Sequence, residues 1–162
     1  MLLLLSIIAC TGSNGGGGAD DSADSGDSGT GQADTGPAML SLQFKMDSDY
    51  IPAMADNGET PVGLFRGSIF AEDQSTDIGP IDGAVSLVDF DVQIDLTPDG
   101  GPTDVAWTSE PLDPQILWVL GCLDADNNDC EKGDPITLPP ENKLRLEAGG
   151  TNFIVQMGML RP

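Results

Sequence analysis

The residues most able to do chemistry lie in one short segment, residues 122–134, which reads CLDADNNDCEKGD. Side chains that carry oxygen alternate along its first half, so that three of them can turn toward one point. The predicted donor set is Asp124, Asp126, Asn128, the carbonyl group of Cys130, and Asp134. A hard cation such as Ca²⁺ takes six to eight oxygen ligands at about 2.4 Å. The segment therefore predicts a calcium-binding loop.

The spacing is similar to the first half of an EF-hand loop and then departs from it. Asp129 stands where the glycine of the tight turn belongs, and Pro135 stands where the bidentate glutamate belongs. We therefore expect a loop between two strands with weak affinity, on the order of 10⁻⁴–10⁻³ M. A second interpretation stays open, in which the Asp and Asn side chains cap the backbone of a polar turn and bind no metal.

Catalysis has few candidate residues in this chain. The sequence has no histidine, which excludes Ser-His-Asp and Cys-His nucleophile systems and His-ligated metal sites. The acidic pairs Glu72–Asp73 and Asp89–Asp91 are similar in composition to a glycosidase dyad. Asp89 and Asp91 fall on the solvent side of a predicted strand, so we expect solubilising charges. We predict that the protein is not an enzyme. The alternative is an accessory subunit or a carboxylate-based hydrolase of the cell envelope.

The charge of the chain limits its partners. Its 162 residues include 27 acidic and 6 basic ones, a formal net charge of −21. Nucleic acid and anionic membrane surfaces would be repelled at long range, so neither is an expected partner. The expected partner is therefore another envelope protein, a peptide or a glycan.

The amino terminus indicates export. Residues 1–9 form an apolar run that is too short to cross a bilayer and has about the length of a signal-peptide core. Ile7-Ile8-Ala9-Cys10 resembles the lipobox of bacterial lipoproteins. The resemblance implies cleavage before Cys10, a diacylglyceryl group on its sulfur, and anchoring through acyl chains. Thr11, rather than Asp, follows the cysteine, which by the same resemblance implies the outer membrane or cell surface.

The expected lipid on Cys10 predicts how the other two cysteines pair. With Cys10 lipidated, Cys122 and Cys130 are left, and they flank the acidic loop. An exported protein sits in an oxidising compartment, so a disulfide between them is expected. That bridge would hold the aspartates of the loop together against their mutual repulsion.

Two composition changes divide the chain. Residues 10–37 form the predicted linker, since nine of the 26 residues at 11–36 are Gly, five are Asp, and none is large and apolar. Such a segment cannot offset the entropy of ordering and should act as a flexible spacer. Residues 38–162 are predicted to form one domain.

Alternation of apolar and polar residues predicts the strands that must position the loop. Val88, Phe90 and Val92 begin the clearest case, with aspartates between them. No helical period runs longer than two turns. Gly63 and Gly67 predict a bulge in one strand. The expected strands are residues 39–44, 62–71, 88–96, 105–108, 115–123, 143–147 and 152–160. Seven strands predict an all-β domain, an antiparallel β-sandwich.

The domain also resembles a family. The motifs that carry the resemblance are Arg66-Gly67-Ser68-Ile69-Phe70, Asp82-Gly83-Ala84-Val85, Leu112-Asp113-Pro114 and Leu123-Asp124-Ala125-Asp126. Together they are similar to the transthyretin-like sandwiches, which include carboxypeptidase regulatory domains. Gln115 departs from the glycine that this family has after the proline. The resemblance implies a non-catalytic module. We therefore expect a lipid-anchored binding or structural module of the envelope, steadied by calcium in the acidic loop.

Overall fold

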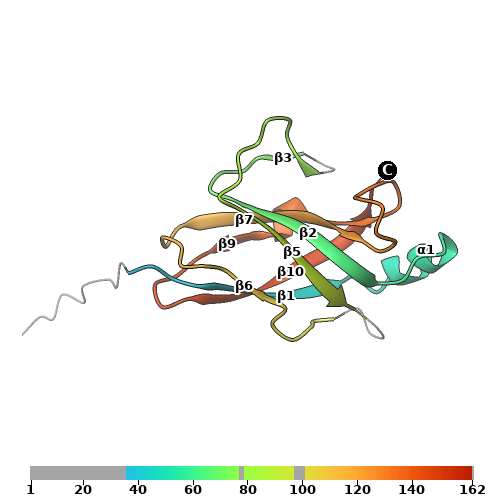
Figure 1. Cartoon of the computed structure of the whole chain (residues 1–162), viewed down its shortest axis with the longest axis horizontal. Coiled ribbons are helices and arrows are strands. Elements are labelled where there is room, and N and C mark those ends of the chain that lie inside the picture. The colour runs from blue at the N-terminus through green and yellow to red at the C-terminus, as the bar shows by residue number, and fades with distance from the viewer. Residues whose placement is uncertain (1–35, 77–78, 97–100, 162) are drawn as a thin grey trace, which may run out of the picture. The chain divides into compact units, whose positions relative to one another are not determined.

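The fold is built almost entirely from strands (Figure 1). The structure is a computed structural model, and it describes residues 36–76, 79–96 and 101–161. The elements in chain order are β1 (Leu40–Met46), α1 (Tyr50–Asp56), β2 (Val62–Phe70), β3 (Ser75–Thr76), β4 (Gly79–Pro80), β5 (Val88–Asp95), β6 (Trp107–Thr108), β7 (Ile116–Asp124), β8 (Pro135–Thr137), the 3₁₀ helix η1 (Pro139–Glu141), β9 (Lys143–Arg145) and β10 (Thr151–Leu160). The predicted all-β class is confirmed.

One main sheet contains all the strands except β3 and β4. Its order is β5-β2-β7-β8-β10-β1-β6, and β9 also pairs with β7. The expectation of a wholly antiparallel arrangement is wrong at one place, because β1 and β10 run parallel, with Leu40 opposite Thr151 and Met46 opposite Met157. Nearly the whole domain connects these two strands, which easily provides the long crossover that parallel neighbours need.

The two end strands of this order come together. The ring of Phe90 on β5 stacks on the ring of Trp107 on β6, with 4.2 Å between the ring centroids. Because β5 and β6 are the opposite ends of the sheet, the sheet must curve until its edges meet. The result is a nearly closed, barrel-like sheet around one core. The finer prediction of two stacked sheets is not confirmed.

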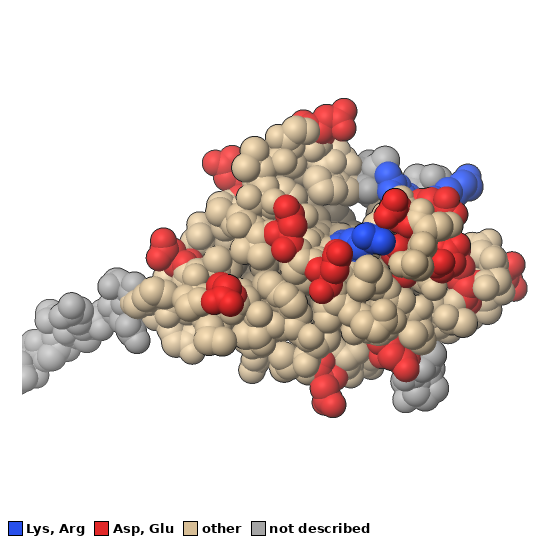
Figure 2. Space-filling view, in the orientation of Figure 1, with Lys and Arg blue, Asp and Glu red and all other residues tan. Residues whose placement is uncertain are grey.

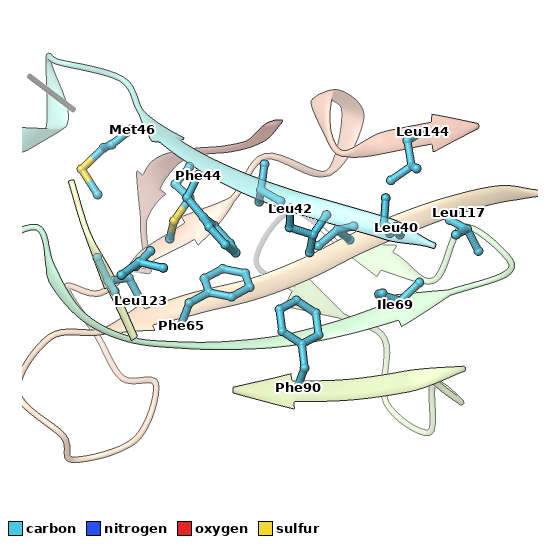
Figure 3. Close-up of a cluster of buried hydrophobic side chains, with 14 of the residues drawn as sticks. Leu40, Leu42, Phe44, Met46, Phe65, Ile69, Phe90, Leu117, Leu123 and Leu144 are labelled. Atoms are coloured by element: carbon cyan, nitrogen blue, oxygen red, sulfur yellow. The ribbon is translucent and has the colours of Figure 1, made fainter. Parts of the chain in front are cut away.

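Alternation along the strands fills this core (Figure 3). Leu40, Leu42 and Phe44 on β1 are fully buried, while the residues between them are partly exposed. The rings of Phe44 and Phe65 are 4.7 Å apart at their centroids, and those of Phe65 and Phe90 are 5.8 Å apart. This aromatic chain links β1, β2 and β5, so burial of apolar surface holds the curved sheet together.

Glycine serves packing rather than a bulge in β2. The predicted bulge is wrong, because β2 pairs with β5 without a break from Val62 to Ile69. A Cβ atom added at Gly67 would lie 2.5 Å from Cε1 of Phe65 and 2.6 Å from Cζ of Phe90. The position must therefore lack a side chain so that the two aromatic rings can fill the core beside it.

Three features were not expected from the sequence: α1, the three-residue strand β8, and a projecting segment that we call the arm. The arm comprises the described parts of residues 71–87 between β2 and β5, and it carries the small β3–β4 ladder. Figure 1 shows it standing away from the main sheet above β7. It is the element that creates a covered space on the outer face.

Candidate functional site

The outer face of β2 and β7 is the floor of the candidate site. Their core-facing residues alternate with residues that point outward, and the pairing places Arg66 opposite Cys122 and Ser68 opposite Leu120. Leu120 is 1% exposed and Ile136, on β8, is 4% exposed, although neither belongs to the main core cluster. They therefore form a second, smaller apolar surface on the outside of the sheet.

A pocket of about 500 Å³ lies over this surface, and we call it the arm pocket. It is lined by Arg66, Ser68, Thr76, Gly79, Pro80, Ile81, Asp82, Leu120, Gly121, Cys122, Cys130, Ile136 and Arg161. The sheet provides the floor, the arm provides one wall, and the acidic loop with Arg161 provides the other. Figure 2 shows the hollow below the arm, with the Lys and Arg atoms of this face gathered on one side of it.

The disulfide borders this pocket. Cys122, at the end of β7, is joined to Cys130 as predicted, with 6.1 Å between the Cα atoms. That separation is within the range of ordinary disulfides. The bridge closes the loop back onto the strand from which it leaves. It therefore fixes the loop wall against the sheet floor.

Asp124 anchors the loop through an ion pair. Its carboxylate is completely buried and its Oδ2 lies 3.0 Å from both Nε and Nη2 of Arg66. Oδ1 accepts the backbone N–H of Asn128, and Oδ2 also accepts that of Asp129. Burial by itself would raise the pKa of Asp124, but Arg66 and the backbone donors hold that pKa below its usual value.

The other predicted ligands also have partners within the protein. Oδ2 of Asp126 accepts a hydrogen bond of 2.8 Å from Nδ2 of Asn128, which also donates to Glu131. The carbonyl group of Cys130 accepts a hydrogen bond from Nη1 of Arg161. Oδ2 of Asp134 accepts the backbone N–H of Glu131 at 2.7 Å. The hydrogen bonds of this loop are those of a capped turn.

Consistent with those contacts, the part of the chain that the structure describes holds no group of three or more Cys, Asp or Glu residues arranged to hold a metal ion. The donor set predicted from the sequence is therefore not gathered around one point in this arrangement. Asp124 is committed to Arg66, and Asn128 turns its amide nitrogen, rather than its oxygen, toward the neighbouring carboxylates. Calcium binding stays a prediction.

Glu59 is a site residue that the sequence did not reveal. It lies between α1 and β2 and lines a second concavity with Asp126, Glu131 and Arg161. Burial raises the pKa of Glu59, and the charges of Asp134, Asp126 and Glu131 raise it further. Its Oε2 atom is buried without a hydrogen-bond partner among the described residues. Negative charge is therefore incompletely compensated here.

Asp134 shares this environment. It is 1% exposed, and burial raises its pKa, followed by the charges of Asp124, Asp126 and Glu131. Only the backbone N–H of Glu131 acts in the opposite direction. Within the acidic loop, the environment of Asp124 therefore favours the charged carboxylate, whereas the environment of Asp134 disfavours it.

The two acidic pairs considered for hydrolysis do not form such an environment. Oδ1 of Asp89 accepts the hydroxyl of Ser68 at 2.7 Å, and hydrogen bonds from Ser68 and Ser86 lower its pKa. Asp73 accepts the hydroxyl and backbone N–H of Ser75, which lower its pKa as well. A general acid needs a raised pKa, so neither Asp73 nor Asp89 is suited to that role.

Sequence reasoning missed Arg66, Arg161, Glu59 and the arm. One signal was present for Arg66, which is the single charged residue in the otherwise apolar stretch 62–70. An arginine that interrupts a buried strand usually has a carboxylate partner. For Arg161 and Glu59 the sequence carries no comparable signal, because their roles depend on where β10 and the segment after α1 pass the loop.

The expected lipid anchor lies outside the described residues, which include neither Cys10 nor residues 1–35. Among the described helices, none has the length and apolar character needed to span a membrane. No family model, curated protein or solved structure matches this chain.

Proposed function

We propose that this protein is a non-catalytic binding module of the cell envelope, held at the outer membrane or cell surface by lipid on Cys10. The arm pocket is the observation that carries the proposal. It combines a volume of about 500 Å³ with an apolar floor and a few polar groups at its rim. Pockets that bind small molecules or short peptide segments have this size and this mixture of groups.

The tether supports the same function. Residues 10–37 are rich in Gly, Asp and Ser and have the composition of a flexible spacer. A lipid on Cys10 would keep the domain at the membrane, and the spacer would let the arm pocket reach a partner. The lipobox resemblance supports an exported protein. The strongly negative charge argues against nucleic acid and anionic membrane surfaces as partners, which leaves an envelope protein, a peptide or a glycan.

Calcium belongs to this proposal as a stabiliser of the loop wall. Its support is the environment of Glu59 and Asp134, where burial first and then the neighbouring negative charges raise the pKa of both. A divalent cation near these carboxylates would relieve that repulsion. The loop would have to reorganise to supply the ligands, which is consistent with the weak affinity expected from the sequence.

The binding function is tested with a simple apolar probe. We expect 1-octanol to shift the backbone amide NMR signals of residues that line the arm pocket. Ile81→Asp places a charge on the arm wall and should abolish the shifts. Ile154→Asp is the matched control, because Ile154 on β10 is 43% exposed against 45% for Ile81 and lies outside the pocket. Shifts that are absent in the wild type, or equal in both variants, would contradict the proposal.

A carboxylate-based hydrolase is the second candidate, and Glu59 favours it. A carboxyl group with a raised pKa is suited to act as a general acid, and Asp126 and Glu131 line the same concavity. Release of 4-nitrophenol from a panel of 4-nitrophenyl glycosides, lost in Glu59→Gln but retained in Glu147→Gln, would establish this function. Absence of release from the wild-type protein would reject it for glycosides.

A further inference from the structure

We infer that the arm pocket binds a carboxylate attached to an apolar body, with Arg161 as the residue that recognises the carboxylate. This inference rests on the proposed binding function and names the ligand chemistry for the same pocket. Two of the three arginines in the chain, Arg66 and Arg161, line this one space. The rest of the lining is apolar at Pro80, Ile81, Leu120, Ile136 and the disulfide, and polar at Ser68, Thr76 and Asp82, so the ligand must satisfy both kinds of surface.

The floor specifies the apolar part of the ligand. Leu120 and Ile136 project outward from β7 and β8, and the Cys122–Cys130 disulfide lies beside them. On the arm side, Ile81 is 45% exposed and Pro80 is next to it. An aliphatic or aromatic group that enters between the floor and the arm would bury its own apolar surface and cover the exposed side chain of Ile81, which contributes about 25 cal/mol for each Å² buried. The floor residues Leu120 and Ile136 have little surface in contact with water already and act as an apolar contact surface.

Arg161 supplies hydrogen-bond donors for the polar part. Its Nη1 donates to the carbonyl group of Cys130, which fixes the guanidinium at the wall of the pocket. Among the described residues it makes no ion pair, so its Nε and Nη2 donors have no carboxylate partner there. A planar guanidinium that is already held in place matches a carboxylate with little further loss of entropy.

Arg66 can contribute only in part. Its Nε and Nη2 are used by Asp124, and Nη2 also lies 3.3 Å from Asp129. Its Nη1 is 3.9 Å from Asp91, which is longer than a hydrogen bond. The donors left for a ligand are therefore mainly Nε and Nη2 of Arg161, against one carboxylate in the lining, that of Asp82 on the arm. A ligand placed at Arg161 presents acceptor oxygens rather than an amine.

The negative charge of the whole chain does not prevent this pairing. At physiological salt, charges separated by more than about 8 Å are largely screened. A monocarboxylate that reaches the pocket therefore responds mainly to the charges that line it, which are the guanidinium groups of Arg66 and Arg161 and the carboxylate of Asp82. The same screening predicts that polyanions with many distant charges gain nothing from this site.

Two sources share this chemistry, a free fatty acid and the carboxyl terminus of a peptide that ends in an apolar residue. The experiment compares octanoate with 1-octanol and octylammonium, and the free acid of N-acetyl-Gly-Val-Leu with its amide. Dissociation constants come from amide NMR titrations of the full chain. Each ligand is measured with the wild type, Arg161→Gln, Arg161→Lys, and the matched control Arg145→Gln, which changes an exposed arginine on β9.

We expect the acid of at least one pair to bind about tenfold more tightly than its neutral partner, as one hydrogen-bonded charge pair provides. Arg161→Gln should remove that preference, Arg161→Lys should restore part of it, and Arg145→Gln should leave it unchanged. The pair that shows the larger effect identifies the source.

Equal binding of octanoate and octanol, with no preference for the peptide acid, would overturn the carboxylate inference while leaving the binding function intact. Tighter binding of octylammonium would also overturn it. If no probe bound to the pocket, both the inference and the proposed binding function would fail. A carboxylate preference that survives Arg161→Gln would remove Arg161 from its assigned role.

Discussion

Arg66 and Asp124 form the ion pair that joins the acidic loop to the sheet, and both Nε and Nη2 of Arg66 lie 3.0 Å from Oδ2 of Asp124. The carboxylate is fully buried, whereas the arginine side chain is 33% exposed. The pair therefore differs from a surface salt bridge. Loss of its positive member would leave a buried charge with only backbone N–H donors to stabilise it.

We predict that Arg66→Met lowers the free energy of unfolding by about 3 kcal/mol, because Asp124 loses its countercharge. Urea unfolding followed by tryptophan fluorescence measures the change. The control is Arg145→Met, which removes a pair between side chains that are 71% and 65% exposed and should cost less than about 1 kcal/mol. Similar losses in both variants would show that the pair has no special role.

Reduction of the disulfide should also destabilise the domain. The bridge joins residues eight positions apart, for which loop-closure entropy gives about 2.5 kcal/mol. We expect urea unfolding of residues 36–162 to shift by this amount in dithiothreitol, and we expect Cys122→Ser with Cys130→Ser to match the reduced protein. Alkylation of both Cys122 and Cys130 by iodoacetamide without prior reduction would contradict the pairing.

The pH dependence of stability follows from opposite pKa shifts in the loop. Glu59 and Asp134 have pKa values above their ordinary values of 4.5 and 3.8, so the stability linked to them is present at low pH and is lost as pH rises through the raised values. Asp124 has a lowered pKa, so its contribution is present at neutral pH and is lost in strong acid.

The melting temperature should therefore rise as the pH falls through the raised pKa of Glu59 toward its ordinary value of 4.5, and decrease again as the pH falls below the ordinary value of 3.8 for Asp124. Glu59→Gln removes one of the two raised carboxyls, so it should increase the melting temperature at pH 7 and flatten the rise. Glu147→Gln, at an exposed side chain on the surface, is the control. Superimposable profiles for wild type and Glu59→Gln would refute this explanation.

Calcium should stabilise the loop weakly. With a dissociation constant near 0.5 mM, about 5 mM calcium adds roughly 1.4 kcal/mol to the free energy of unfolding, which raises the melting temperature by several degrees. Asp126→Ala should abolish the increase, while Asp95→Ala on the exposed face of β5 should retain it. Identical melts in calcium and in chelator would reject calcium at this loop.

The sequence predicted what depends on local pattern. Alternation identified the buried face of β5, where Phe90 and Ile94 are buried and Asp89 and Asp91 are exposed. The apolar run at 115–123 correctly predicted a central strand, since β7 pairs with β2, β8 and β9. The pairing of Cys122 with Cys130 follows from counting cysteines together with the expectation that the chain is exported.

What the sequence could not predict depends on contacts between distant segments. Arg66 reaches Asp124 across 58 positions, and Arg161 reaches Cys130 across 31. No periodic pattern records such contacts, so the sequence predicts Asp124 as a calcium ligand, with a metal-free capped turn as the open alternative, and does not reveal its pairing with Arg66. The parallel pairing of β1 with β10 and the covering of the outer face by the arm are likewise consequences of how the whole sheet curves.

Mass spectrometry of the native protein extracted from membranes decides whether this binding module is tethered at the envelope. We predict a mature chain that begins at Cys10 and carries a diacylglyceryl thioether on that residue, and a Cys10→Ala variant that is missing from the membrane fraction. An unmodified chain beginning at Met1 and recovered from the soluble fraction would contradict it.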